Sequence, residues 1–384
     1  MQHSDILIVG AGPTGMALAV ALAQAGRQPR IVDARTADAA QGDKRILALS
    51  HGSQQILDRL GVWRDIEATP IRTIHVSQQG GFGRTLLHAA DYGVPALGYV
   101  VAASSLVAAL ARRLDALGAT VDHECEVTNL AAGAADVLVS HSKADAAPLC
   151  ARLVALAEGT VSAEDDRAVT ARDYRQHAVI CTARPAAPHG GIAYERFTPH
   201  GPLALLPFGP DYAVVFTVPA DASDALLGLD ESAFLAELQR SIGSRVRLIS
   251  ASARARYPLL LRYRREPVGR RTVWLGNAAQ TLHPVAGQGF NLALRDVWGL
   301  TETLASAGPD DDPGAVTLLE RYARARRLDR IGAIGFTDTL IRVFSNEQGL
   351  WRAARGGGLT VLDLLPPLKH FVAKRMMFGA RAWP

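Results

Sequence analysis

The chain has 384 residues, of which 48% are hydrophobic and 20% charged, the composition of a globular protein rather than of a disordered or fibrous one. The formal net charge is only +4, so the basic surplus that a nucleic-acid-binding surface requires is missing. Three scattered cysteines, Cys125, Cys150 and Cys181, lack the spacing of a structural zinc site and indicate a reducing, cytoplasmic setting with no bound metal.

The N-terminal pattern predicts a βαβ unit. A short apolar strand is expected over 5–9, an alanine- and leucine-rich helix over 14–25, and a second strand over 30–33. Residues 6–26 carry no charge, but three glycines and a proline divide this stretch and Asp5 precedes it. We therefore exclude a signal peptide or a membrane span here.

The middle of the chain follows a different pattern. A further helix is predicted over 104–118 and a strand over 120–127, whereas the alanine-rich stretch 131–148 is predicted to be a loop. Apolar runs between Gly, Pro and Asp turns are typical of an antiparallel sheet, and they occupy 71–77, 193–198, 203–208 and 212–218. Helical periodicity returns over 231–242 and from Gln288 onward, and the glycine run 356–358 is predicted to mark a boundary before the C-terminal tail.

A glycine pattern, Gly-Ala-Gly-Pro-Thr-Gly, lies at 10–15 between the first strand and the first helix. Gly10 permits a tight turn, Gly12 lets a pyrophosphate approach the backbone, and Gly15 lets the helix pack on the strand. Asp33 ends the second strand, where a carboxylate accepts a hydrogen bond from a ribose hydroxyl. The pattern indicates a dinucleotide site at a helix N-terminus; the alternative is a glycine-rich turn in an unrelated α/β protein.

A second motif, VWLGNAAQTLHPVAGQGFNLALRD, occupies 273–296 and runs from an apolar strand through a loop into a helix. With it we group five shorter stretches, at 45–50, 60–63, 98–101, 194–197 and 201–207. Together they resemble the FAD-dependent hydroxylases of ubiquinone biosynthesis, in the p-hydroxybenzoate hydroxylase superfamily. The resemblance covers roughly residues 4–345 and is strongest to the branch of 2-octaprenyl-6-methoxyphenol hydroxylases.

The resemblance implies that FAD binds through both motifs. The first glycine loop would hold the pyrophosphate, Asp33 the ribose, Val127 the adenine, and the loop before the 288 helix the flavin ring. The implied cofactor-binding residues are Gly10, Ala11, Gly12, Pro13, Thr14, Gly15, Asp33, Ala34, Arg45, Val127, Gly276, Asn277, Pro284, Gly287, Gln288, Gly289 and Asn291. His283 is a candidate acid or base, although a histidine before a proline in a turn is more often structural.

These patterns and the resemblance predict an α/β fold with a Rossmann-like FAD-binding domain, an inserted antiparallel substrate sheet and a C-terminal helical region. The FAD-binding domain is expected in three pieces, 1–70, 98–172 and 265–340; the substrate sheet in 71–97 and 173–264; the helical tail in 341–384. Within the tail, apolar residues at helical spacing predict either contact with a membrane surface or packing on the protein's own core: Leu368, Phe371, Val372, Met376 and Met377.

The implied activity is hydroxylation of the aromatic ring of a polyprenylated (methoxy)phenol through a flavin hydroperoxide, with O₂ and with NADPH or NADH as reductant. Two alternatives stay open: a flavoprotein reductase of a prenyl lipid, and a non-catalytic, FAD-holding subunit of a biosynthetic complex. Glu158 keeps the second alternative open, because it replaces the Asp of an Ala-Asp-Gly segment that contacts FAD in the family. The expected location is cytoplasmic, with peripheral contact at the inner membrane.

Overall fold

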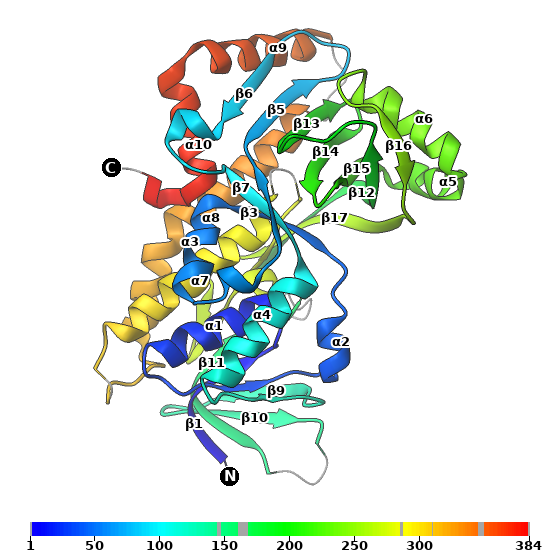
Figure 1. Cartoon of the computed structure of the whole chain (residues 1–384). Coiled ribbons are helices and arrows are strands. Elements are labelled where there is room, and N and C mark those ends of the chain that lie inside the picture. Colours follow the sequence, from blue (N-terminus) through cyan, green and yellow to red (C-terminus); the bar gives the residue numbers. More distant parts are fainter. Residues whose placement is uncertain are drawn as a thin grey trace.

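The computed structural model describes residues 2–143, 147–159, 168–284, 287–308, 310–344 and 349–382. Two large sheets lie at opposite ends of the molecule, and a bundle of helices joins them and covers one side (Figure 1). This mixture of a parallel sheet, antiparallel sheets and C-terminal helices confirms the predicted α/β class. No described helix combines the length and the apolar character that crossing a membrane would require.

The first sheet has a parallel centre built from buried apolar strands. Their order is β19 (Thr272–Trp274), β11 (Leu149–Leu156), β1 (Gln2–Val9), β2 (Arg30–Val32) and β8 (Val121–Asp122). Three antiparallel strands extend it: β18 (Val268–Gly269), β10 (Val137–His141) and β9 (Val127–Ala132). Helices α1 (Pro13–Gln24), α4 (Ala103–Ala116) and α7 (Gln288–Ala305) share the main core with this sheet. The predicted βαβ unit is therefore confirmed.

Two predictions fail at the edge of this sheet. The expected loop over 131–148 contains the end of β9 and all of β10, because Val137 and Val139 are fully buried against β11. The expected strand over 120–127 is broken, since the chain leaves β8 after Asp122 and Glu124 adopts a positive φ of 55°. In both cases the outcome depends on pairing with a neighbouring strand, which local composition does not reveal.

The second sheet has nine strands and confirms the predicted antiparallel region. Its order is β20 (Gln280–Thr281), β17 (Ala255–Arg264), β12 (Val169–Pro185), β15 (Asp211–Pro219), β14 (Gly201–Phe208), β13 (Ile192–Thr198), β5 (Thr73–Gln78) and β6 (Arg84–His88), with β16 (Leu248–Ala251) beside β12. All neighbours are antiparallel except β13 and β5. Helices α5 (Ser223–Gly228) and α6 (Glu231–Ile242) cover one face.

Helix α6 has the limits that the sequence predicts, because local signals define both of its ends. The Asp230 side chain accepts a hydrogen bond from the main-chain N–H of Ala233 (2.8 Å) and caps the first turn. At the other end Gly243 has a φ of +81°, which stops the helix. Phe234 and Leu238 then pack on the sheet.

A small sheet lies between the two large ones. It consists of β3 (Ile46–Ser50), β7 (Gly98–Ala102) and β4 (Ala68–Ile71). Helix α3 (His51–Arg59) follows β3 without a loop, and the short helix α2 (Ala37–Gln41) precedes it. The Ser50 hydroxyl accepts from the N–H of Ser53 and caps α3 (3.2 Å).

The C-terminal helices are α8 (Val316–Phe344), α9 (Gly349–Leu364) and α10 (Pro366–Phe378), followed by the short helix η6 (Gly379–Ala382). In Figure 1, α9 and α10 lie at the top of the molecule, whereas α8 runs through its middle. Helix α8 runs across the expected domain boundary at 340, and α9 lies along β6. The glycine run 356–358, predicted to mark a boundary, lies inside α9, so that prediction is wrong.

The position of α9 explains one of these glycines. A Cβ atom at Gly356 would lie 2.6 Å from the carbonyl oxygen of Phe82, in the turn between β5 and β6. A Cβ atom at Gly357 would meet nothing within 4 Å. Close approach of α9 to the hairpin therefore requires glycine at 356 but not at 357.

We predict opposite effects for two neighbouring substitutions. Gly356→Ala should lower the free energy of unfolding by about 1–3 kcal/mol, because the added methyl group overpacks the hairpin contact. Gly357→Ala should raise it by up to about 1 kcal/mol, because alanine favours the helix. Urea unfolding measures both; equal shifts of the same sign would contradict the packing described here.

Candidate functional site

The glycine loop lies where the carboxyl ends of three parallel strands meet. Gly10 adopts a φ of +101°, and its N–H donates to the carbonyl of Val32 at the end of β2 (2.8 Å). The N–H of Ala157, just after β11, donates to the carbonyl of Val9 (2.8 Å). A Cβ atom at Gly10 would approach the carbonyl of Ala157 to 2.9 Å, so the loop needs glycine here. Glycine loop, Asp33 and the segment 157–159 are thus brought together.

The start of α1 has the features of a diphosphate site. Gly12 caps the helix with extended backbone and no side-chain hydrogen bond, and Pro13 is the first helical residue. A Cβ atom at Gly12 would meet no protein atom within 4 Å, whereas one at Gly15 would lie 1.8 Å from the carbonyl oxygen of Gly10. Gly15 therefore serves packing, while the main-chain N–H groups near Gly12 are accessible to an anion. These residues fit the pyrophosphate of FAD.

Asp33 is buried beside this helix start. Its carboxylate accepts hydrogen bonds from the N–H of Ala11 (2.6 Å) and from the guanidinium of Arg35 (2.8 and 2.9 Å). Burial alone raises the pKa of Asp33, but the hydrogen bonds from Arg35 and Ala11 outweigh it and hold that pKa below its usual value. Asp33 is therefore ionised at neutral pH. Sequence reasoning missed Arg35, which no pattern singles out.

Glu158 follows β11 and is solvent-exposed. Desolvation and, next, the charges of Asp33 and Glu126 raise the pKa of Glu158 above its usual value. The replacement of Asp by Glu therefore leaves a carboxyl group in the same acidic neighbourhood as Asp33. The segment 157–159 lies beside the glycine loop, as the family resemblance implies.

Three other predicted cofactor residues lie outside the glycine loop. Arg45 forms a bidentate ion pair with Asp43 and is about half exposed. Val127 begins β9 and packs against the core of the first sheet, and Ala34 is exposed after β2. Their roles along the FAD remain predictions.

The second motif contacts the first. Gly276 and Asn277 form a short 3₁₀ helix, η4 (Gly276–Ala278), directly after β19. Gly276 has a φ of +57°, and a Cβ atom there would lie 2.8 Å from the hydroxyl of Thr14. The two sequence motifs, which are more than 250 residues apart, therefore meet at the start of α1.

The buried amide of Asn291 holds main-chain segments together, and its predicted position close to the flavin stays a prediction. Its Oδ1 accepts from the N–H of Ser50 (2.8 Å) and the hydroxyl of Ser53 (2.7 Å). Its Nδ2 donates to the carbonyls of Ala48 (3.0 Å) and Gly287 (2.7 Å). Asn291 thus joins the end of β3 to the start of α7.

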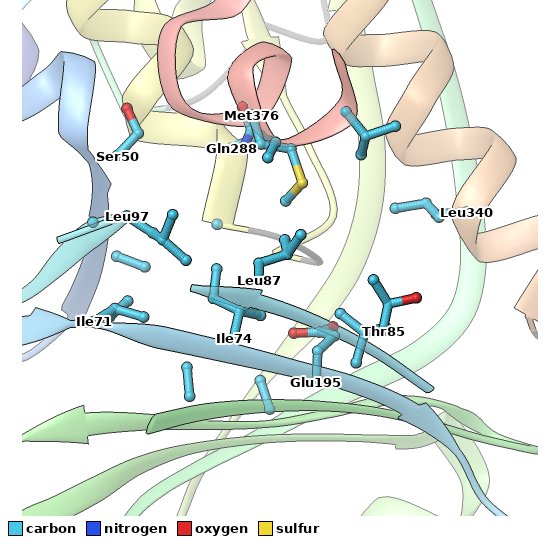
Figure 2. Close-up of a pocket in the computed structure, with 18 of the residues that line it drawn as sticks. Ser50, Ile71, Ile74, Thr85, Leu87, Leu97, Glu195, Gln288, Leu340 and Met376 are labelled. Atoms are coloured by element: carbon cyan, nitrogen blue, oxygen red, sulfur yellow. The ribbon is translucent and has the colours of Figure 1, made fainter. Parts of the chain in front are cut away.

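A cavity of about 510 Å³ lies beside this junction (Figure 2). The predicted flavin-facing residues Pro284, Gly287 and Gln288 form part of its first wall. The second sheet forms another wall through residues such as Ile74, Leu87 and Leu206, and the third consists of Leu340, Leu359, Leu362, Val372, Met376 and Met377 from α8, α9 and α10. The lining is almost entirely apolar, so the cavity suits a hydrophobic ligand.

His283, the candidate acid or base, is not among the residues that line this cavity. Its ring is buried, and its centroid lies 5.6 Å from that of Tyr174 in an edge-to-face contact. Burial lowers the pKa of His283 to about 4, so its imidazole is neutral at physiological pH. Its assignment as an acid or base stays a prediction.

Sequence reasoning also missed Glu195, which lines the cavity from β13. Burial raises the pKa of Glu195 to about 7. Residue 195 lies within the stretch 194–197 that carries the family resemblance, but nothing in that stretch shows which way the side chain points.

One group among the described residues offers three metal-ligand atoms close together: His3, Asp136 and Cys150. It lies at the start of β1, at the opposite end of that strand from the glycine loop. Burial, together with the hydrogen bond to Asp136, raises the pKa of Cys150 to about 11, which opposes the thiolate form that binds metals.

Comparison with known proteins agrees with this geometry. The chain matches the FAD binding domain family over residues 3–332. It is 34% identical to the ubiquinone hydroxylase UbiL of Rhodospirillum rubrum, over 99% of this chain and 91% of that protein. The protein is an FAD-dependent hydroxylase of the ubiquinone-biosynthesis family.

A further relative supports the assignment, and a solved structure matches the fold. The hydroxylase is 30% identical to the 3-demethoxyubiquinol 3-hydroxylase of Escherichia coli, over 97% of this chain and 98% of that protein. Its fold is similar to that of p-nitrophenol 4-monooxygenase PnpA from Pseudomonas putida, with a TM-score of 0.77 at 17% identity, covering 99% of this chain and 100% of that chain.

We expect Gly12→Val to separate cofactor binding from folding. Valine fits the extended backbone at Gly12 and its Cβ atom meets no protein atom within 4 Å, but the side chain would occupy the path of the pyrophosphate. FAD affinity should fall about tenfold or more, which corresponds to a loss of about 1.4 kcal/mol or more. Flavin absorbance after gel filtration, with urea unfolding of the FAD-free protein, measures both properties.

The matched control is Gly15→Val, which forces a side chain into the carbonyl of Gly10 and should destabilise the FAD-free protein as well. A yellow Gly12→Val protein with full flavin content would contradict the placement of the pyrophosphate.

Proposed function

We propose that this hydroxylase adds an oxygen atom to the aromatic ring of a polyprenylated methoxyphenol during ubiquinone biosynthesis, using FAD, O₂ and NADPH or NADH. The observation that carries the proposal is the shared cavity, whose walls combine the predicted flavin-facing loop with an apolar surface of β-strands and C-terminal helices. A phenol ring with an apolar tail matches the apolar lining of the cavity and its position beside the predicted flavin-facing loop.

When bound, FAD supplies the electron transfer and oxygen activation of the reaction. The protein chain orients the reactants and excludes water from the site. Pro284 and the start of α7 would hold the flavin edge, while apolar residues of the second sheet would orient the ring and exclude water from it. The pyrophosphate and ribose would be held by the α1 helix start and Asp33.

The two alternative functions have less support. The relatives from Rhodospirillum rubrum, Escherichia coli and Danio rerio are named as hydroxylases or monooxygenases. A non-catalytic role was kept open by Glu158, yet that residue lies beside the glycine loop and retains a carboxyl group. The geometry therefore favours an active hydroxylase.

For the ring position, we propose the carbon para to the phenol hydroxyl, as in the branch that the sequence resembles most. The hydroxyl donates electron density to this carbon, and a neighbouring methoxy group raises it further. The name of a related hydroxylase gives demethoxyubiquinol as its substrate. Hydroxylation at another ring carbon, as in a sister branch of the family, is therefore the competing outcome.

Deletion of the gene in its host should deplete ubiquinone and accumulate a polyprenyl-methoxyphenol that lacks one oxygen atom. Mass spectrometry of lipid extracts identifies the accumulated compound, and a plasmid copy of the gene is the control. Accumulation of a phenol without the methoxy group would move the protein to a sister branch. Unchanged ubiquinone in a host with no redundant hydroxylase would contradict the proposed function.

We propose further that the C-terminal helices contact a lipid bilayer. Helix α10 carries the predicted apolar stripe, and the structure divides it between two faces. Val372, Met376 and Met377 face inward and line the cavity. On the outer side, exposed apolar residues continue from the end of α9 into α10, namely Val361, Leu364, Leu365, Leu368 and Phe371.

The two faces suggest how a lipid substrate reaches the site. A cavity of about 510 Å³ accommodates a ring and the first part of a tail, but not a long polyprenyl chain. The remainder would lie against the apolar surface of α9 and α10, where exposed Lys374 also favours an anionic membrane. Transfer from bilayer to cavity then avoids exposing the tail to water.

Replacement of Leu364 and Leu368 by Ser should weaken binding to vesicles that contain anionic lipid by about 100-fold or more, since each buried apolar side chain contributes about 1.5–3 kcal/mol and each 1.4 kcal/mol corresponds to about tenfold. The matched control replaces Leu138 and Ile249, exposed apolar residues on the two large sheets, by Ser. Vesicle co-sedimentation measures both variants. Turnover of a short-tailed phenol should stay normal in both, and equal loss of vesicle binding would contradict the proposed contact.

A further inference from the structure

Glu195 differs from three other polar residues that line the cavity, Thr85, Lys369 and Asn291. The Thr85 hydroxyl donates to a main-chain carbonyl of α9 (2.8 Å), Lys369 pairs with Asp363 (3.0 Å), and Asn291 is saturated by main-chain and serine groups. In contrast, no described residue donates a hydrogen bond to Glu195, although its Oε1 is buried. A buried hydrogen-bond acceptor without a donor destabilises the folded protein, so a functional role would explain the presence of Glu195 here.

The register of β13 fixes the direction of this side chain. Glu195 lies opposite Ala204 of β14 and Val76 of β5, and all three line the cavity. The next residue, Arg196, points to the other face, where its Nε donates to the carbonyl of Ser241 in α6 (2.9 Å). Figure 2 shows the Glu195 carboxyl group projecting from the sheet into the cavity, between Ile74 and Thr85.

The charged groups around the cavity leave Glu195 without a counter-ion among the described residues. Arg196 is directed to α6, Lys369 is engaged by Asp363, and Arg355 donates to the carbonyl of Val343 (2.9 Å). Burial in this apolar lining raises the pKa of Glu195 to about 7. The carboxyl group is thus able both to accept and to release a proton near neutral pH.

We infer that Glu195 is the base that accepts the proton of the substrate's phenol hydroxyl. This inference rests on the proposed function, because it needs a phenol in the cavity. The phenolic O–H bond breaks as an O–H bond forms on Glu195, and the electron pair stays on the phenolic oxygen. Delocalised into the ring, this pair raises the electron density at the ortho and para carbons.

The remaining atoms balance within the family's reaction. O₂ and two electrons from NADPH or NADH supply the oxygen atom that the ring carbon receives, and the second oxygen atom leaves as water. The attacked carbon then loses its hydrogen as a proton when the ring regains aromaticity. The proton on Glu195 returns to the phenolic oxygen, which restores the carboxylate for the next cycle.

Glu195→Gln tests the inference with nearly unchanged side-chain volume, and Glu237→Gln, the same change on the exposed face of α6, is the control. With a short-tailed 2-methoxyphenol as substrate, hydroxylation by Glu195→Gln should fall about tenfold or more, with FAD content unchanged. Wild-type hydroxylation should rise with pH through about 7, because the base is active only when deprotonated. Glu195→Gln should lose this dependence, and Glu195→Asp should retain part of it.

A binding measurement separates this inference from the proposed function. Without a reductant, flavin absorbance should report that the wild type binds the phenol about tenfold more tightly than its methyl ether, which has no proton to donate. Glu195→Leu should bind both about equally. If the wild type makes no product from any phenol, the proposed function is wrong. The ratio of the affinities for the phenol and its methyl ether still tests whether Glu195 accepts the phenolic proton. Unchanged discrimination in Glu195→Leu, or an unchanged rate and pH profile in Glu195→Gln, would overturn the inference.

Discussion

Four hydrogen bonds of one buried amide, that of Asn291, hold the candidate active site together. They connect the end of β3 and the start of α3 to the first turn of α7, and they use the full donor and acceptor capacity of the side chain. The same two segments form the cavity wall next to the predicted flavin edge. Because the amide is buried, its loss would leave main-chain groups of both segments without partners. The geometry of this wall therefore depends on Asn291, whatever else contacts the cofactor.

A second constraint fixes the C-terminal helices. Asp296 of α7 and Asp329 of α8 form buried ion pairs with Arg326, and Asp329 also pairs with Arg295. Burial alone raises the pKa of Asp329, but the two guanidinium groups outweigh it and hold that pKa at about 2. The same carboxylate accepts from the N–H of Ala380, just after α10 (2.8 Å). The cluster thus anchors the helices that form the third wall of the cavity, and removal of Asp329 would leave the buried guanidinium of Arg295 without its ion-pair partner.

The part of the fold that the sequence predicts is the part that depends on local signals. Glycine turns, capping residues and the periodicity of apolar residues predict the βαβ unit, the antiparallel middle region and helix α6. The hairpin of β9 and β10, and the continuation of α9 through Gly356, depend on contacts with distant segments, and local composition indicated the opposite. The site divides in the same way: the glycine motif predicted the convergence at Gly10 and Asp33, whereas Arg35 and Glu195 were missed because their importance comes from where the fold directs their side chains.

The tail shows why one apolar pattern supported two interpretations. Five apolar residues at helical spacing predicted either membrane contact or packing on the core, and the structure assigns them to different faces of α10. Leu368 and Phe371 are exposed, whereas Met377 is buried and Val372 and Met376 line the cavity. A helix that is apolar on both faces suits a wall between a hydrophobic cavity and a hydrophobic environment, and a surface helix with a single buried stripe would not. The arrangement of apolar residues in α10 is therefore itself an argument that the substrate is a lipid.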